Sequence, residues 1–197
     1  MPRLDFPGQF YHVIVRGVER RPIFKTGEDK TDFLGRLAKS LQKTCSQCFA
    51  WALMTNHLHL LILSGAEGLA ALMHPLLTGY VGAFNRRYGR VGHLVQNRFK
   101  AILCDANAYF LQLVRYIHLN PVRAGIVKTL EELAGYPWTG HPAVLGRIRI
   151  AWQAVDPLLS HFGSTVDQAR RAYGVFLQDG WTEGHRDDLE GGGRLGT

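Results

Sequence analysis

Cysteine is scarce in this chain. Its three cysteines among 197 residues are too few, and odd in number, for the disulfide framework that stabilises many small extracellular domains. Cys45 and Cys48 have C-x-x-C spacing, but no second C-x-x-C exists to complete a zinc site. We therefore interpret the cysteines as structural thiols of a reducing compartment.

Long apolar runs are also absent. No stretch approaches the roughly 20 residues that a membrane-spanning helix needs. The first 8 residues lack the apolar core of a secretory signal. We expect a cytoplasmic protein that makes no contact with a membrane.

Acidic residues are in the minority and are unevenly placed. The chain has 16 Asp and Glu against 23 Lys and Arg, for a net charge of +7. Residues 1–128 carry 17 basic against 7 acidic side chains, whereas residues 129–197 carry 6 against 9. The basic surplus of the first segment indicates a polyanionic partner, most commonly nucleic acid. A basic, solvated surface without such a partner is the alternative.

The hydrophobic pattern alternates between strand and helix periodicity. It predicts strands at residues 10–17, 49–54, 57–63 and 99–104, and helices at residues 28–44, 67–88, 106–120 and 165–178. Glycine and proline predict a break at residues 129–142. This order predicts an α+β fold, with a central, mostly antiparallel sheet flanked by helices. We assign residues 1–128 to one domain and residues 129–197 to a partly helical C-terminal extension whose last residues are disordered.

Two histidines lie two residues apart in the predicted strand at 57–63. Side chains at positions i and i+2 of a strand point to the same face, so His57 and His59 project together. Two convergent imidazoles suit a divalent metal ion. The alternative is a pair of hydrogen-bonded histidines that line a polar pocket.

Tyr116 and Asn120 lie four residues apart in the predicted third helix, and therefore on one face of it. The amide oxygen of Asn120 could complete a ligand set with the two histidines, suited to Mn²⁺ or Mg²⁺ held jointly with a phosphate. A tyrosine can attack a phosphodiester and form a covalent intermediate. The alternative is a packed aromatic side chain and a polar residue at a helix end.

These motifs resemble those of the REP-associated tyrosine transposases, within the single-tyrosine HUH (His-hydrophobic-His) transposases. The resemblance rests on ALMTNHLHLL at residues 52–61 and YIHLNPVRAG at residues 116–125, with further matches at residues 11–17, 84–88 and 92–100. It spans about residues 8–128. Val95 stands where a tryptophan is common in the family, and Asn97 where a glycine is common.

The resemblance implies an HUH-endonuclease domain with a ferredoxin-like or RRM-like sandwich. In that family His57, His59 and Asn120 would hold Mg²⁺ or Mn²⁺, and Tyr116 would be the nucleophile. The implied activity is cleavage and transfer of single-stranded DNA beside a palindromic repeat hairpin, through a 5′-phosphotyrosine. The implied protein is a monomer or homodimer associated with the nucleoid.

Basic side chains lie close to these motifs in the sequence. Arginine suits bidentate contact with phosphate or guanine. We predict DNA contacts for Arg16, Arg20, Arg21, Arg86, Arg87, Arg90, Arg98, Lys100 and Arg123.

Two other functions remain open at this stage. The first is a domesticated nucleic-acid-binding regulator of repeats that does not cut DNA. The second is a metal-dependent hydrolase of small substrates. The tyrosine favours the transposase over a regulator, because a protein that only binds DNA needs no nucleophile. The basic clusters, and the lack of carboxylates beside the histidines, disfavour the hydrolase.

Overall fold

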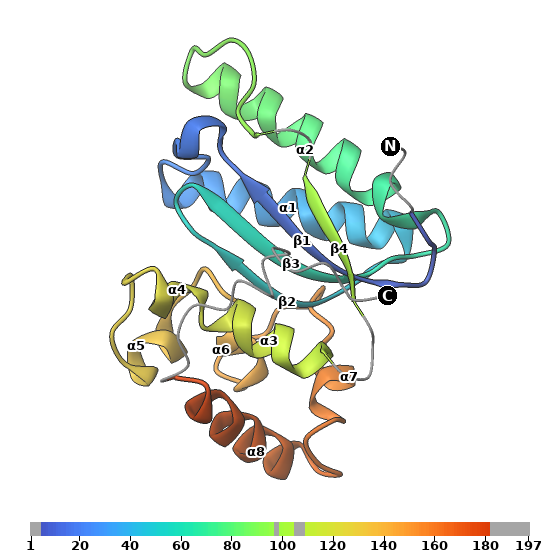
Figure 1. The fold of residues 1–197 in the computed structure, drawn as a ribbon, viewed down its shortest axis with the longest axis vertical. Helices are drawn as coiled ribbons and strands as arrows, with labels where there is room; N and C mark the ends of the chain where they lie inside the picture. The colour runs from blue at the N-terminus through green and yellow to red at the C-terminus, as the bar shows by residue number, and fades with distance from the viewer. Residues whose placement is uncertain (1–4, 97–98, 105–108, 182–197) are drawn as a thin grey trace, which may run out of the picture.

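A single four-stranded antiparallel sheet organises the molecule (Figure 1). The computed structural model describes residues 5–96, 99–104 and 109–181. The strand order is β2-β3-β1-β4. The strands are β1 (Phe10–Arg16), β2 (Gln47–Leu53), β3 (His57–Leu63) and β4 (Lys100–Cys104). Helices cover both faces of the sheet (Figure 1), which confirms the predicted α+β fold.

Strand β3 lies in the interior of the sheet, paired with β1 on one side and β2 on the other. Its side chains alternate between two hydrophobic clusters. Leu58 and Leu60 belong to the first cluster, whereas Leu61 belongs to the second. His57 and His59 share the face of Leu61, as predicted from the strand period.

Helices α1 (Gly27–Thr44) and α2 (Gly68–Arg87) cover one face of the sheet. Helix α1 begins with a capping box between Thr26 and Asp29 and ends at Cys45, whose backbone is left-handed at φ 51°. Phe33 of α1 and Leu72 of α2 are fully buried against the strands.

The opposite face is covered by α3 (Phe110–His118) and by the C-terminal segment (Figure 1). The remaining helices are short apart from the last: α4 (Asn120–Arg123), α5 (Leu130–Gly135), α6 (His141–Val144), α7 (Val155–Leu159) and α8 (Val166–Asp179). Val114 of α3, Leu158 of α7 and Tyr173 of α8 share one hydrophobic cluster with β2 and β3. The division at residue 128 stays a prediction, and the end predicted to be disordered lies outside the described residues.

The predicted third helix differs from the observed one at its C-terminal end. Helix α3 ends at His118, and α4 begins at Asn120 after a single intervening residue. Pro121 has no backbone N–H and fits only the first turn of a new helix, so α3 cannot continue through it. Residues 105–108, where this helix was predicted to begin, lie outside the described residues. The predicted break at 129–142 instead contains α5 and the start of α6.

None of the helices in the described parts of the chain combines the length and apolar character needed to cross a lipid bilayer.

A buried polar cluster joins the C-terminal segment to α3. The Tyr173 hydroxyl lies 2.8 Å from Nδ1 of His118 and 2.8 Å from Nδ1 of His141. All three side chains are at most 3% exposed. A phenol has one hydrogen, so it donates to one imidazole and accepts from the other. The cluster therefore fixes α8 and α6 against the helix that carries Tyr116.

We expect Tyr173→Phe to lower the free energy of unfolding by about 1–3 kcal/mol, because two buried imidazole nitrogens lose their partner. Urea denaturation followed by circular dichroism measures the change. The matched control is Tyr136→Phe, since the Tyr136 hydroxyl makes no hydrogen bond within the described residues. A Tyr173→Phe midpoint equal to that of the wild type would contradict the role of the cluster.

The same cluster predicts a loss of stability in acid. Burial, and then the charge of Arg147, lowers the pKa of His141 to about 4, whereas an unfolded histidine has a pKa near 6.5. Between these values only the unfolded chain binds the proton, so stability falls as pH falls from about 6.5 to 4, by up to about 3 kcal/mol. Urea midpoints at pH 7 and 4.5 measure this loss. His141→Gln should lose clearly less between these pH values, and an equal loss in both proteins would refute the assignment.

Candidate active site

A surface cavity of about 370 Å³ brings together residues that lie far apart in the sequence. It lies at the end of β1 and the start of β3, facing α4. Its lining is Arg16, Arg20, Asn56, His57, Asn120, Arg123 and Ala124. Two predicted metal ligands and three predicted DNA-binding arginines therefore share one opening.

The turn after β1 shapes this cavity. A Cβ on Gly17 would lie 2.0 Å from the carbonyl oxygen of Arg21, so no larger residue fits there without a change in the backbone. The Gly17 amide donates to the Asn56 carbonyl at 2.8 Å, which joins the turn to the start of β3. This turn places Arg16 and Arg20 beside the histidine strand.

His59 lies in the interior, fully buried. Its Nδ1 lies 2.9 Å from Nε2 of His12, and its Nε2 has no hydrogen-bond partner in the part of the chain that the structure describes. Burial, and then the charges of His12 and His57, hold the pKa of His59 well below its usual range. A neutral imidazole with an unpaired buried nitrogen has the protonation state that a metal ligand requires.

His57 is half-buried at the mouth of the cavity. Its Nδ1 lies 2.7 Å from Oδ1 of Asn56, whose own amide nitrogen donates to the Arg20 carbonyl at 3.1 Å. That second bond identifies the Asn56 atom facing His57 as oxygen, so His57 Nδ1 carries the hydrogen. The lone pair of His57 is then on Nε2. The rings of His57 and His59 are 5.3 Å apart and nearly perpendicular.

Tyr116 packs directly against the buried imidazoles. Its ring centre is 5.7 Å from that of His59 and 5.8 Å from that of His12, and the side chain is 2% exposed. The Arg123 guanidinium lies 4.8 Å above the tyrosine ring. The predicted nucleophile is therefore beside the predicted ligands and is covered by an arginine that lines the cavity.

Asn120 is held by the backbone of the tyrosine helix. Its amide nitrogen donates to the Tyr116 carbonyl at 3.0 Å, and the same carbonyl accepts from Arg123 at 3.2 Å. Because the amide nitrogen is bonded to the Tyr116 carbonyl, the amide oxygen is the atom of Asn120 that would serve as a metal ligand. The break between α3 and α4 thus preserves the one-turn proximity predicted for Tyr116 and Asn120.

The residues at this site fit a weakly held divalent ion. Within the described residues no three His, Cys, Asp or Glu side chains lie close enough to hold a metal. Two imidazoles and one amide oxygen would leave coordination positions for phosphate and water, as with Mg²⁺ or Mn²⁺. The unpaired buried Nε2 of His59 is the structural feature that favours an ion here.

The other described basic residues predicted to bind DNA do not line the cavity. Arg21 pairs with Glu19 at 2.8 Å, and Arg87 pairs with the buried Asp29. The Arg90 guanidinium lies 5.9 Å from the Phe84 ring. Arg86 and Lys100 are exposed, and Arg98 lies outside the described residues. The DNA contacts assigned to this group stay predictions.

His12 is the residue that sequence reasoning missed. It is fully buried on β1 and stacks on His59, with ring centres 5.1 Å apart. The alternation of β1 places it on the same face as Ile14, which pairs with His59 in the sheet. The available signal was a histidine within a predicted strand, but the register that brings it to His59 cannot be read from either strand alone.

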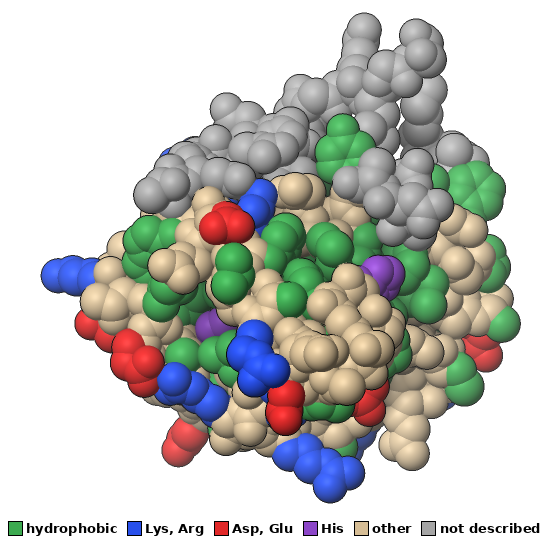
Figure 2. All heavy atoms as spheres, turned by 90° about the horizontal axis from the view of Figure 1, so that it is seen from below, with side chains coloured by type: hydrophobic (Ala, Val, Ile, Leu, Met, Phe, Trp, Pro, Cys, Tyr) green, Lys and Arg blue, Asp and Glu red, His purple; other side chains and the backbone are tan. Residues whose placement is uncertain are grey.

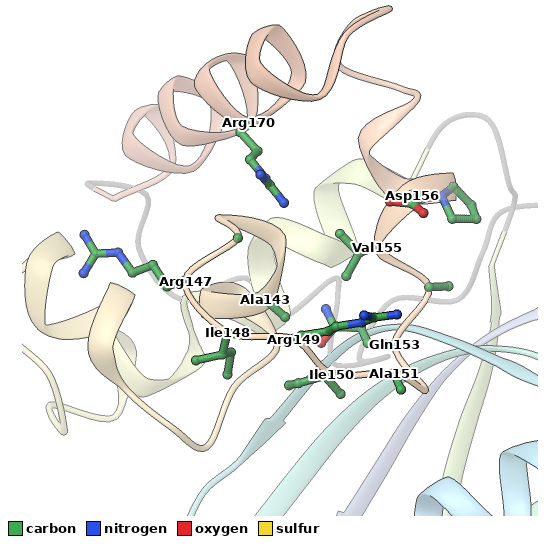
Figure 3. A pocket seen from close by; sticks show the side chains of 13 residues that line it. Ala143, Arg147, Ile148, Arg149, Ile150, Ala151, Gln153, Val155, Asp156 and Arg170 are labelled. Atoms are coloured by element: carbon green, nitrogen blue, oxygen red, sulfur yellow. The ribbon is translucent and has the colours of Figure 1, made fainter.

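A second, larger cavity of about 610 Å³ lies between α6, α7 and α8. Arg170 points into it, Arg149 lies along its floor and Asp156 stands at its rim (Figure 3). It contains none of the predicted site residues. On the face viewed in Figure 2, Lys and Arg side chains are scattered among acidic and apolar ones, without forming a continuous basic surface. The candidate site is therefore the cavity of about 370 Å³ that is lined by Arg16 and His57.

Comparison with known proteins bears on the fold and the family of this chain. The fold is similar to that of a solved structure described as "Structure of the REP associates tyrosine transposase bound to a REP hairpin". The TM-score is 0.60, and the two sequences are 17% identical over 84% of this chain and 92% of that chain. At this identity the likeness concerns the fold. No curated protein matches the sequence. The family model described as "Transposase IS200 like" matches residues 7–120. Because that match covers more than half of the sequence, this chain belongs to the IS200-like transposase family.

Proposed function

We propose that this protein is a metal-dependent endonuclease and strand transferase for single-stranded DNA. It cuts beside palindromic repeat hairpins through a 5′-phosphotyrosine intermediate. The observation that carries this proposal is the packing of Tyr116 against His59, whose Nε2 has no partner among the described residues, next to a cavity lined by arginines.

In the proposed reaction the Tyr116 oxygen attacks a backbone phosphorus. A bond from the tyrosine oxygen to phosphorus forms, the bond from phosphorus to the 3′-oxygen breaks, and the proton lost by the phenol is balanced by the proton gained at the 3′-oxygen. The products are a 5′-phosphotyrosine and a 3′-hydroxyl. Attack of a 3′-hydroxyl on the phosphotyrosine reverses these steps, so joining requires no nucleotide cofactor.

The side chains of the cavity have distinct roles in this scheme. Arg16 and Arg20 bind the phosphates of the incoming strand, because guanidinium groups pair well with phosphate oxygens. A free tyrosine has a pKa near 10, so the attack requires charge stabilisation at the phosphate. A Mg²⁺ or Mn²⁺ bound by His57, His59 and Asn120 would supply it by polarising the phosphate. The Arg123 guanidinium lies 4.8 Å above the Tyr116 ring, which supports a further role for it in binding the same phosphate.

The proposed substrate is a hairpin with a single-stranded foot. The similar solved structure is a complex with a REP hairpin, and we extend that class of ligand to this chain. The arginine-lined cavity accommodates an unpaired strand better than a small apolar ligand. The same lining disfavours the small-substrate hydrolase.

Binding should weaken steeply with salt, and Arg16→Ala should reduce that dependence. Removing one phosphate contact lowers the slope of log affinity against log salt by about 0.7 for a single strand. Fluorescence anisotropy with a labelled hairpin at several salt concentrations measures the slope. Arg147→Ala is the control, because Arg147 pairs with Glu131 at 2.9 Å, outside the cavity. Affinity that is independent of salt would contradict the proposed contacts.

A repeat-binding regulator that does not cut DNA is the second candidate. The observation in its favour is the 2% exposure of Tyr116 beneath Arg123. The two functions are separated by incubating the protein with Mg²⁺ or Mn²⁺ and a labelled hairpin, then resolving the mixture on a denaturing gel. A covalent protein–DNA band supports the transposase, whereas tight binding with no such band under either metal supports the regulator.

A further inference from the structure

His12 and His59 form a hydrogen-bonded pair beneath the candidate site. Nε2 of His12 lies 2.9 Å from Nδ1 of His59, both side chains are fully buried, and the rings are stacked with an interplanar angle of 24°. The His12 ring also meets the edge of Tyr116, at 5.8 Å between centres. His12 therefore touches both a proposed metal ligand and the proposed nucleophile without lining the cavity.

The contact has two possible hydrogen positions with different consequences. If His59 Nδ1 carries the hydrogen, it donates to His12 and leaves a lone pair on His59 Nε2. If His12 Nε2 carries the hydrogen, the neutral His59 must carry its own hydrogen on Nε2. Only the first arrangement allows His59 to bind a metal through Nε2.

We propose that His12 is a positioning residue that accepts the hydrogen bond from His59 Nδ1 and so directs the lone pair of His59 Nε2 toward the metal. This inference rests on the proposed function, because it assumes a metal at the site. Histidine ligands in proteins generally donate their second nitrogen to a carboxylate, a carbonyl or water, which sets ring orientation and tautomer. Here a second imidazole takes that place.

The stacking adds a steric constraint to the hydrogen bond. β1 and β3 are adjacent, with Ile14 opposite His59 and His12 opposite Leu61, so both imidazoles are attached to a rigid part of the sheet. The Tyr116 ring packs edge-on against both imidazoles. The loss of His12 should therefore change the orientation of His59 before it changes the DNA-contacting surface.

The test compares His12→Phe, which keeps a ring but removes the acceptor, with His12→Gln, which restores an acceptor oxygen. Nitrogen-15 NMR of the metal-free protein reports which His59 nitrogen carries the hydrogen. Mn²⁺ binding is followed by electron paramagnetic resonance. We expect the Nδ1–H form of His59 in the wild type and in His12→Gln. In His12→Phe we expect a loss of that form and a fall in Mn²⁺ affinity of roughly 10- to 100-fold.

The matched control is His141→Phe, which removes another buried histidine with a hydrogen-bonded partner. It should lower thermal stability without changing Mn²⁺ affinity. Wild-type Mn²⁺ affinity in folded His12→Phe, or an Nε2–H form of His59 in the wild type, would overturn the inference. If His12→Phe does not fold, the wild-type tautomer and His12→Gln decide the question.

Failure of the proposed function would be visible separately. A protein that forms no covalent adduct with hairpin DNA, but shows the expected His59 tautomer and the expected loss of Mn²⁺ affinity in His12→Phe, keeps the positioning role and loses the nuclease. A protein that forms the adduct, but whose His59 tautomer is unaltered in His12→Phe, keeps the nuclease and loses the positioning role.

Discussion

Tyr116→Phe is expected to abolish the covalent protein–DNA adduct while leaving hairpin affinity within a few-fold of the wild type. The substitution removes only the hydroxyl oxygen that would bond to phosphorus. The phenyl ring retains its packing against His12 and His59 and beneath Arg123. A denaturing gel with a labelled hairpin measures the adduct, and fluorescence anisotropy measures the affinity.

The control for this variant is Tyr109→Phe. Tyr109 is the N-cap residue of the same helix α3 and is 42% exposed, so its hydroxyl should be dispensable. An adduct of wild-type yield in Tyr116→Phe would assign the nucleophile to another residue and refute the proposed mechanism.

His57→Ala is expected to slow adduct formation by at least about 100-fold, because metal polarisation of a phosphate contributes several kcal/mol and each 1.4 kcal/mol is tenfold in rate. His57 is preferable to His59 for this test. It is half-buried at the cavity, whereas His59 is fully buried and its removal would also leave a void in the core. Single-turnover reactions with Mg²⁺ or Mn²⁺ measure the rate.

Hairpin affinity should fall much less than the rate in His57→Ala, because the arginines of the cavity remain. His93→Ala is the control, since His93 is exposed and lies outside this cavity. Equal losses of affinity and rate would indicate that His57 contacts DNA and does not hold a metal.

The sequence predicts most of the sheet and the face on which the histidines project. Within a strand at residues 57–63 the two-residue period leaves one assignment of faces, so His57, His59 and Leu61 share a face. The sequence predicts the ends of the helices less well. Pro121 signals the end of a helix, but the chain immediately starts α4, which keeps Asn120 beside Tyr116.

The register between neighbouring strands could not be predicted from the sequence. His12 meets His59 across 47 positions of sequence, and nothing in either strand states which residues pair. The same holds for the arginines. Arg16, Arg20 and Arg123 line one cavity, whereas Arg87 of α2 pairs with Asp29 of the adjacent helix α1, 58 positions away in the sequence. Charge and spacing alone treat all of these residues as equivalent.

The central claim is that Tyr116 is the nucleophile and acts beside a metal held by the paired histidines. Peptide mapping by mass spectrometry, after reaction with a hairpin oligonucleotide and nuclease trimming, tests this claim most directly. With Mn²⁺ we predict a nucleotide attached through its 5′-phosphate to Tyr116, and with a chelator we predict no modified peptide. Attachment at another residue, or cleavage of the DNA with no nucleotide on the protein, would contradict it.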